Sequence, residues 1–273
     1  MDDKTTRYLV DLARRAGDAI LEIYDTDFAV ETKADESPLT LADLASHRVI
    51  AAGLEALDPS IPLLSEETRP PEFAVRSGWQ RYWLVDPLDG TKEFVNRNGE
   101  FTVNIALIEG HKPVFGVVGV PVQGLVYTGD APRGVAQRIT THGAEPLQGR
   151  AMAEDRPLVV VASRSHGGER LEDYLGALAQ RFPEVSRTPV GSSLKLCILA
   201  EGRADLYPRL GPTSEWDIAA AHAVLAAAGG DLWATDGSPL TYNSKESFLN
   251  PEFFAVADAS YPWRERLPPV SAQ

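Results

Sequence analysis

The chain has 273 residues, of which 44% are hydrophobic, so it can bury the core of one large domain or of two closely joined halves. Lys and Arg total 26 against 39 Asp and Glu, which gives a formal net charge of −13. This charge argues against nucleic-acid backbones and anionic membranes as main partners, because both would be repelled. It leaves open a small anionic substrate, provided that some acidic residues hold divalent cations.

The single cysteine, Cys197, cannot form an internal disulfide, which favours a reducing, cytoplasmic compartment. It lies in the apolar run SSLKLCILAEG and is expected to be a buried small hydrophobe rather than a nucleophile. The N-terminal sequence has no apolar core of the signal-peptide type. No run approaches the roughly 18 apolar residues of a membrane span, so we expect no integral membrane segment.

In the first half, apolar periodicity predicts an amphipathic helix over residues 5–24. A second helix is predicted from an N-cap at Thr40, with Asp43 three residues later, to about residue 57. Residues 81–85 then suit a short buried strand, and the segment DPLDGTKEF that follows directly is rich in turn residues.

Three further strands complete the expected first half. Residues 101–109 alternate well enough to form one strand, and residues 113–129 predict two more, joined by a turn at Gln123-Gly124. The first half is therefore expected to pack helices on an antiparallel-rich sheet. The polar stretch of residues 129–156 is the predicted seam between the halves.

Beyond the seam, strands and helices alternate, which is typical of an α/β unit. The predicted elements are a strand over 158–163, a helix over 169–182, a helix over 192–202 that Gly202 stops, a strand over 204–210 and a helix over 216–230. The chain is accordingly divided into an N-terminal α+β half, residues 1–150, and a C-terminal α/β half, residues 151–273, which completes the site.

Acidic residues concentrate in three motifs, SEET at 65–68, DPLDGT at 86–91 and EWD at 215–217. In the second motif Asp86 and Asp89 follow a predicted buried strand, and the Pro and Gly beside them favour a fixed, sharply turned backbone. Two aspartates held in this way would converge on one spot, and converging hard oxygen ligands suit Mg²⁺.

Each piece also has a simpler explanation. DPLDGT alone could be an ordinary Asp-rich turn, although the Leu88 carbonyl and the Thr91 hydroxyl would add oxygen atoms at the same place. The pair Glu66-Glu67 could be a solvated surface. Asp217 could be favoured only by the helix dipole, because it lies in the first turn of a predicted helix. Asp43 could be only the last residue of a capping box.

Taken together, SEE, then DPLDGTKEF twenty residues after Glu66, then EWDIAAAHAVLAAAGG resemble the inositol monophosphatase superfamily over most of the chain. Within it the sequence is most similar to the bacterial 3'(2'),5'-bisphosphate nucleotidase family, which removes the 3'-phosphate of adenosine 3',5'-bisphosphate. Lys92-Glu93-Phe94 follows DGT, where inositol monophosphatases usually carry Thr-Asn-Phe. The segments KADESPLTLAD, VASRSH, GSSLKLCILAEGRADLYPRLGPTSEWD and LTYNSKESFLNPEF also resemble this branch.

The resemblance implies an α/β fold with α+β character, a layered α/β/α/β/α sandwich of the inositol monophosphatase and fructose-1,6-bisphosphatase type, with the site at the junction of the halves. It also implies Mg²⁺ as the cofactor, two or three ions. The metal ligands it implies are Glu66, Asp86, the Leu88 carbonyl, Asp89 and Asp217.

For catalysis, the resemblance implies that Asp43 and Thr91 orient and deprotonate the attacking water, with Glu66 as a further catalytic residue and Lys33 as a nearby helper. The backbone amides of Gly90 and Thr91 would hold the phosphate. The implied substrate contacts are Glu66, Leu88, Asp89, Gly90, Thr91 and Asp217 at the phosphate, and Ser192, Lys195, Arg209 and His166 toward the nucleotide end.

The expected activity is a Mg²⁺-dependent phosphomonoesterase that converts adenosine 3',5'-bisphosphate to AMP and phosphate by attack of a metal-activated water. Two alternatives stay open: an inositol-phosphate or fructose-1,6-bisphosphate phosphatase, and a non-catalytic, metal-dependent metabolite-binding protein. The resemblance further implies lithium sensitivity and a role in sulfur assimilation. It is compatible with a homodimer and with peripheral association at the inner membrane.

Overall fold

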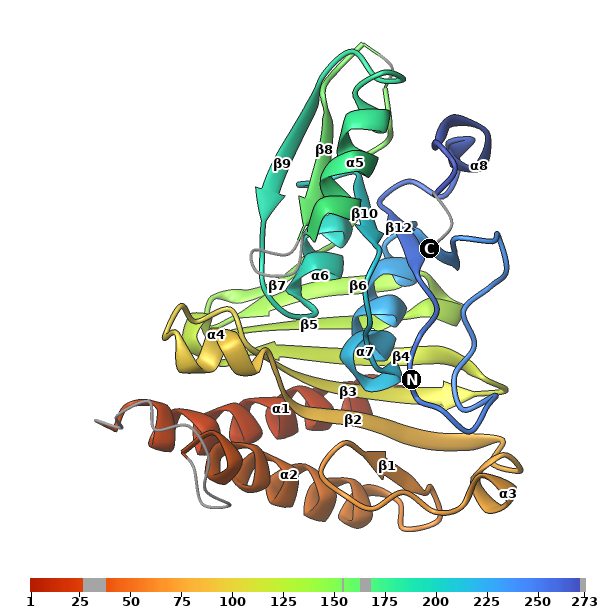
Figure 1. Ribbon diagram of the computed structural model, residues 1–273. Helices are drawn as coiled ribbons and strands as arrows, with labels where there is room; N and C mark the ends of the chain where they lie inside the picture. Colours follow the sequence, from red (N-terminus) through yellow and green to blue (C-terminus); the bar gives the residue numbers. More distant parts are fainter. Residues whose placement is uncertain (27–37, 154, 163–167, 271–273) are drawn as a thin grey trace.

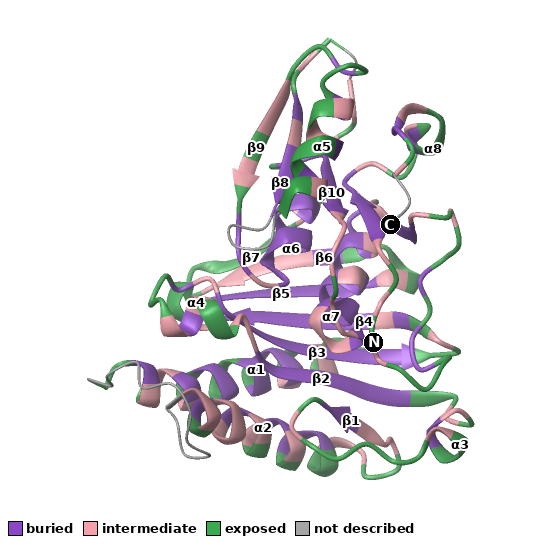
Figure 2. Cartoon of the chain, in the orientation of Figure 1, coloured by how far each residue is buried: buried purple, intermediate pink, exposed green. Residues whose placement is uncertain are grey.

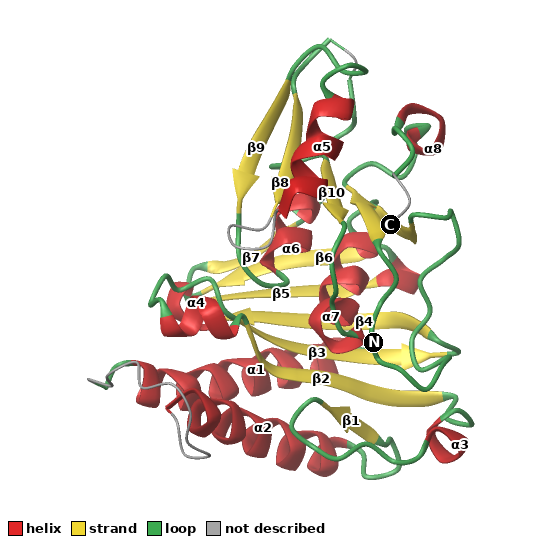
Figure 3. Ribbon diagram, in the orientation of Figure 1, coloured by secondary structure: helices red, strands yellow, loops and turns green. Residues whose placement is uncertain are grey.

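The computed structural model describes residues 1–26, 38–153, 155–162 and 168–270. It contains two β-sheets separated and flanked by helices (Figures 1 and 3). Within the described residues, no helix has both the length and the apolar character that crossing a membrane requires.

The first sheet has seven strands in sequence order, and all neighbours except the parallel β1–β2 pair are antiparallel. Its strands are β1 (Leu63–Ser65), β2 (Arg81–Asp89), β3 (Thr102–Glu109), β4 (Lys112–Val120), β5 (Leu125–Asp130), β6 (Val135–Thr140) and β7 (Gly143–Pro146). Short 3-10 turns, η1 (Pro121–Gln123) and η2 (Ala131–Arg133), join β4 to β5 and β5 to β6. Strands β2 to β5 are buried over most of their length (Figure 2), because helices cover both faces.

Helices α1 (Asp3–Tyr24) and α2 (Pro38–Leu57) pack on one face of this sheet. The buried residues of α1 recur at the three- and four-residue spacing of one helix face, which confirms the helix expected over 5–24. The predicted N-cap at Thr40 is wrong, because α2 already begins at Pro38. A proline is favoured in the first helical turn, where its missing N–H has no intrahelical partner to lose.

The strands expected over 101–109 and 113–129 are confirmed as β3, β4 and β5. The polar stretch 129–156 is not simply a connector, because β6 and β7 lie within it and extend the first sheet. This hairpin forms the edge of the sheet and is largely exposed, so its sequence is polar although its backbone is paired.

The second sheet has five strands in the order β11-β12-β10-β8-β9. They are β8 (Leu158–Ala162), β9 (Val185–Pro189), β10 (Leu206–Arg209), β11 (Asp231–Ala234) and β12 (Phe253–Val256). The helices α6 (Leu194–Ala200) and α7 (Glu215–Ala227) share one core with both sheets, and α5 (Gly168–Leu178) and α8 (Trp263–Arg266) pack on the outer face of the second sheet. The expected α/β/α/β/α layering is therefore confirmed.

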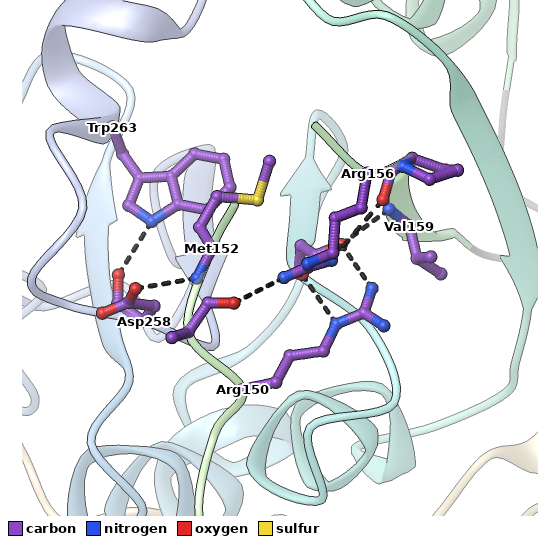
Figure 4. Close-up of polar contacts among 9 residues, drawn as sticks. Arg150, Met152, Arg156, Val159, Asp258 and Trp263 are labelled. Atoms are coloured by element: carbon purple, nitrogen blue, oxygen red, sulfur yellow. Dashed lines mark hydrogen bonds and ion pairs between the residues drawn. The ribbon is translucent and has the colours of Figure 1, made fainter. Parts of the chain in front are cut away.

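The buried carboxylate of Asp205 fixes the linker between the sheets, residues 147–153 and 155–157. Figure 4 shows Arg150, Arg156 and Val159, which bind this carboxylate. Asp205 accepts hydrogen bonds from Arg150 Nε at 2.8 Å, Arg156 at 2.8 Å and the backbone N–H of Val159 at 2.7 Å. Burial alone would raise the pKa of Asp205, but the arginine hydrogen bonds hold it below its usual value. The proposed division at residue 150 falls within this linker and remains a prediction.

Helix α7 lies directly against the first sheet, because β4 and β5 carry glycines beneath it. A Cβ atom on Gly116 would overlap the carbonyl oxygen of Ala220, and one on Gly129 would overlap the backbone of Val224. Side chains at these two positions would hold the helix away from the strands. The close approach therefore sets the height of α7, and with it the position of the residues at its N-terminus.

We expect Gly116→Ala to destabilise the protein by about 2 kcal/mol or more, because backbone must move to admit the methyl group. Urea unfolding followed by circular dichroism measures the change. Gly176→Ala is the matched control, since Gly176 lies in α5 with no atom within 4 Å of an added Cβ. The control should be neutral or stabilising, because alanine favours the helix. Equal stability of the two variants would contradict the close packing of α7.

Candidate active site

A cavity of about 350 Å³ lies where the two halves meet. Three stretches far apart in sequence line it: Glu66 with residues 86–93 from the first half, residues 192–196 before and within α6, and residues 207–218 from β10 to α7. The three acidic motifs therefore line one cavity: the residue that follows β1, the end of β2 and the start of helix α7 (Glu215–Ala227).

Asp86 and Asp89 reach this cavity from strand β2 and not from a turn, so the predicted end of the strand at residue 85 is wrong. Asp86 pairs with Asn104 and Asp89 with Thr102, and the register shifts between these two pairs. Side chains three residues apart on a regular strand point to opposite faces, so the extra residue of this bulge turns both aspartates toward the same cavity. A hydrogen bond of 2.8 Å from Ser46 Oγ to the Pro87 carbonyl joins the bulge to α2.

Carboxylate oxygens of Glu66, Asp86 and Asp217 lie within 4.8 Å of one another. Glu66 follows strand β1, Asp86 lies on β2, and Asp217 occupies the first turn of α7. The backbone N–H of Ser214 donates to Asp217 Oδ2 at 2.9 Å, which holds this carboxylate over the positive end of the helix. Carboxylates from both halves of the chain therefore converge, and their role as metal ligands remains a prediction.

Asp89 completes the acidic set and is held from both halves. Its Oδ2 atom accepts hydrogen bonds from the Ser193 backbone N–H and, at 3.4 Å, from Thr102 Oγ1. Ser193 Oγ also bonds Thr102 and Asn104, each at 2.8 Å. The sequence analysis did not predict Ser193, Thr102 or Asn104 as partners in this network. The available signal was the pair Thr102 and Asn104, two polar residues on one face of an otherwise apolar strand.

The carboxylates repel one another strongly. Burial first, and then the charges of Asp89, Glu66 and Asp217, raise the pKa of Asp86 well above its usual value. Burial and the charge of Asp217 raise the pKa of Asp89 to about 7, and burial raises that of Asp217 to about 6. A donor set made only of crowded carboxylate oxygens fits hard divalent cations, which would replace the bound protons.

Glu66 lies at the exposed rim with its carboxylate turned to this set. Partial burial and the charges of Glu67 and Asp89 raise its pKa to about 7. Asp43, on α2, is a further carboxylate of the region, and burial and the charges of Glu67 and Glu66 raise its pKa to about 8. Asp43 Oδ1 is buried and has no hydrogen-bond partner among the described residues.

Gly90 and Thr91 line the cavity at the start of α4 (Thr91–Val95). Gly90 has φ of 100°, a left-handed conformation that favours glycine, and a Cβ there would lie 3.2 Å from Phe101 Cα. No hydrogen bond joins Asp43 to Thr91, both of which the structure describes. Asp43 does not line the cavity. Their joint action on water therefore remains a prediction.

Cationic side chains line the same cavity as the carboxylates. Lys195 is buried in α6, donates to the Ser192 carbonyl at 2.8 Å and lies 5.7 Å from the centre of the Tyr207 ring. Arg209 Nε donates to the Gly211 carbonyl at 3.1 Å, and its charge counters the raised pKa of Asp217. Three of the four residues predicted for the nucleotide end, Ser192, Lys195 and Arg209, thus lie in the same cavity as the carboxylates.

Two other predicted residues, His166 and Lys33, lie outside the described residues. Tyr207, Thr213 and Ser214 also line the cavity, and sequence reasoning did not predict them as site residues. Tyr207 also contacts Phe253 edge to face, with ring centres 5.7 Å apart. Its ring thus serves both the core and the cavity wall.

The layered fold and the carboxylate cluster define a class of metal-dependent phosphatases. The sequence profile described as the inositol monophosphatase family matches residues 1–260, and the chain belongs to that family. It is 53% identical over 244 residues to the 3'(2'),5'-bisphosphate nucleotidase CysQ of Escherichia coli (strain K12), covering 89% of this chain and 95% of that protein. The CysQ of Haemophilus influenzae is 36% identical over 253 residues, with 93% of each chain covered.

Solved structures agree with this assignment. The crystal structure of CysQ from Bacteroides thetaiotaomicron, a bacterial member of the inositol monophosphatase family, superposes with a TM-score of 0.84 at 41% identity, covering 93% of this chain and 98% of that one. An inositol monophosphatase from Zymomonas mobilis shares the fold at 24% identity, with a TM-score of 0.75 and 95% of each chain covered. The expected superfamily and fold are therefore confirmed.

Proposed function

We propose that the protein is a Mg²⁺-dependent 3'(2'),5'-bisphosphate nucleotidase that removes the 3'-phosphate of adenosine 3',5'-bisphosphate and yields AMP. The observation that carries the proposal is one cavity lined both by four carboxylates, those of Glu66, Asp86, Asp89 and Asp217, and by the cationic side chains of Lys195 and Arg209. A substrate with two phosphates would meet metal ions at the carboxylates and direct cationic contacts in the same cavity. The names of the CysQ relatives support the same activity.

Two or three Mg²⁺ ions would be held by the four carboxylates together with the Leu88 carbonyl. Bound there, they would supply a water of lowered pKa and neutralise charge on the leaving oxygen. The Leu88 N–H donates to Asp86 Oδ1 at 3.0 Å, which holds the peptide unit immediately before the Leu88 carbonyl. This arrangement leaves Thr91 and Asp43 to orient the water and accept its proton.

The second phosphate would lie against Lys195, Arg209 and Ser192. The Lys195 ammonium has three protons and one described acceptor, the Ser192 carbonyl, so it can donate to a bound anion as well. Arg209 donates to two backbone carbonyls, and other N–H groups of its guanidinium can donate to the ligand. Gly90 and Thr91 would donate backbone N–H groups to the phosphate that is cleaved.

Phosphate release in the presence of Mg²⁺ tests the proposal. We expect kcat/KM for adenosine 3',5'-bisphosphate to exceed that for inositol 1-phosphate and fructose 1,6-bisphosphate at least a hundredfold, about 2.7 kcal/mol in transition-state binding. Lys195→Met should reduce the rate on the nucleotide more than the rate on inositol 1-phosphate. Comparable rates on the three substrates would indicate a phosphatase that does not prefer the nucleotide. No release from any of them would favour the metabolite-binding alternative.

The wider setting of this activity follows from the same proposal. Clearance of adenosine 3',5'-bisphosphate would place the protein in sulfur assimilation. A cytoplasmic location, peripheral association with the inner membrane and a homodimer remain predictions.

A further inference from the structure

A buried polar cluster lies outside the cavity lining, and we call it the Arg76 cluster. It consists of Arg76, Tyr82, Glu215, Tyr242 and Asn243, each of them exposed by 2% or less. Burying an arginine and a glutamate is costly unless every polar atom is paired. Yet Arg76 Nε, Tyr82 Oη and Glu215 Oε1 have no hydrogen-bond partner among the described residues. The cluster is therefore poorly built for stability alone.

Its hydrogen bonds join three segments that are distant in sequence. Arg76, at the end of α3 (Phe73–Arg76), donates to Asn243 Oδ1 and to the carbonyl of Glu246, and Asn243 Nδ2 donates back to the Arg76 carbonyl at 2.6 Å. The backbone N–H of Asn243 donates to Glu215 Oε2 at 2.7 Å. Glu215 is the first residue of α7, two residues before Asp217.

Contacts between aromatic side chains connect the same arginine to Glu66; we call them the aromatic route. The Arg76 guanidinium lies 4.2 Å from the centre of the Phe248 ring, and Phe248 packs against Trp216 with ring centres 5.0 Å apart. The Trp216 side chain in turn lies beside Glu66, where it offsets part of the rise in the pKa of that carboxyl. Arg76 thus reaches Asp217 through Asn243 and Glu215, and Glu66 through Phe248 and Trp216.

Glu66 and Asp217 come from different halves and repel each other across the cluster of carboxylates, so nothing in their own chemistry keeps them together before a cation binds. We propose that Arg76 is a positioning residue that holds Glu66 and Asp217 at metal-binding separation by tying α3, the loop of residues 241–248 and the start of α7 into one unit. The inference rests on the proposed metal-dependent function and adds to it a residue that does not itself contact metal or substrate.

Isothermal titration of the metal-free, full-length protein with Mg²⁺ tests the proposal. Arg76→Met keeps the apolar length of the side chain and removes every donor. We expect it to weaken Mg²⁺ binding at least tenfold, about 1.4 kcal/mol, while kcat at saturating Mg²⁺ stays within threefold of wild type. Phe248→Leu cuts only the aromatic route and should weaken binding about threefold. It also serves if Arg76→Met does not fold.

The matched control is Arg150→Met, which removes an arginine that pairs with buried Asp205 away from the cavity. Its Mg²⁺ affinity should stay within twofold of wild type at a temperature where both variants are folded. Wild-type affinity in Arg76→Met and Phe248→Leu, or an equal loss in Arg150→Met, would overturn the inference. If the wild-type protein binds Mg²⁺ and releases phosphate in that case, the proposed function stands; if it does neither, both fail.

Discussion

Replacing Asp86 with asparagine should reduce kcat/KM for phosphate release by at least about a thousandfold, roughly 4 kcal/mol in transition-state stabilisation. Asparagine has nearly the same shape, so the change removes one negative charge from the set that would hold Mg²⁺. Asp86 is 1% exposed and lies within ligand distance of both Glu66 and Asp217, so another side chain cannot replace it. Asp89→Asn should have a similar effect, because its carboxylate lines the same cavity.

The loss should not come from unfolding. Removing a carboxylate from a crowded acidic set relieves repulsion, so Asp86→Asn should keep or raise the Tm measured in EDTA. Asp18→Asn, on the exposed face of α1, makes the same chemical change without touching the cavity and should leave kcat/KM unchanged. Near-normal turnover in both Asp86→Asn and Asp89→Asn would rule out the metal site as proposed.

In the absence of metal, we expect the free energy of unfolding to fall by at least about 4 kcal/mol between pH 6 and pH 9. The folded protein holds protons on Asp43, Asp86 and Asp89 at pH values where the unfolded chain has already lost them, since burial and mutual repulsion raise these pKa values, to about 8 for Asp43 and about 7 for Asp89. The unfolded state therefore binds fewer protons, and stability is lost as pH rises through the folded-state values.

Urea unfolding in EDTA across this range measures the slope. Burial lowers the pKa of His222 to about 4, which acts in the opposite direction, but only below the usual histidine value near 6.5. Saturating Mg²⁺ should flatten the slope, because cations would favour the ionised carboxylates. The double variant Asp86→Asn/Asp89→Asn should reduce the slope without metal and leave the part that Asp43 contributes. Stability that stays constant or rises with pH in EDTA would show that the carboxylates do not repel one another as the structure indicates.

The acidic site could be predicted because its chemistry is concentrated in short motifs. Asp86 and Asp89 are close in sequence, and the helix that begins beside Asp217 has a clear apolar pattern. The strand through Asp86 and Asp89 could not be predicted in the same way. Proline and glycine favour a turn locally, whereas the bulge depends on pairing with Asn104 and Thr102 in the next strand.

The Arg76 cluster was out of reach for a different reason. Arg76 and Asn243 are 167 residues apart, and neither lies in a motif that indicates the other. An isolated arginine in a short helix is indistinguishable in sequence from a solvated surface residue. The edge hairpin β6–β7 was missed because an exposed strand pair has little apolar alternation, so its polar composition resembled a connector.

The packing of α7 on the first sheet has a consequence for synthesis of the chain. When a ribosome has released only the first half, the face of β2 to β5 that α7 will cover is bare, and the acidic set lacks Asp217. Helix α7 removes both deficiencies, because it covers this apolar face and also carries Asp217. Tight metal binding would therefore begin only after α7 has covered this apolar face of the sheet.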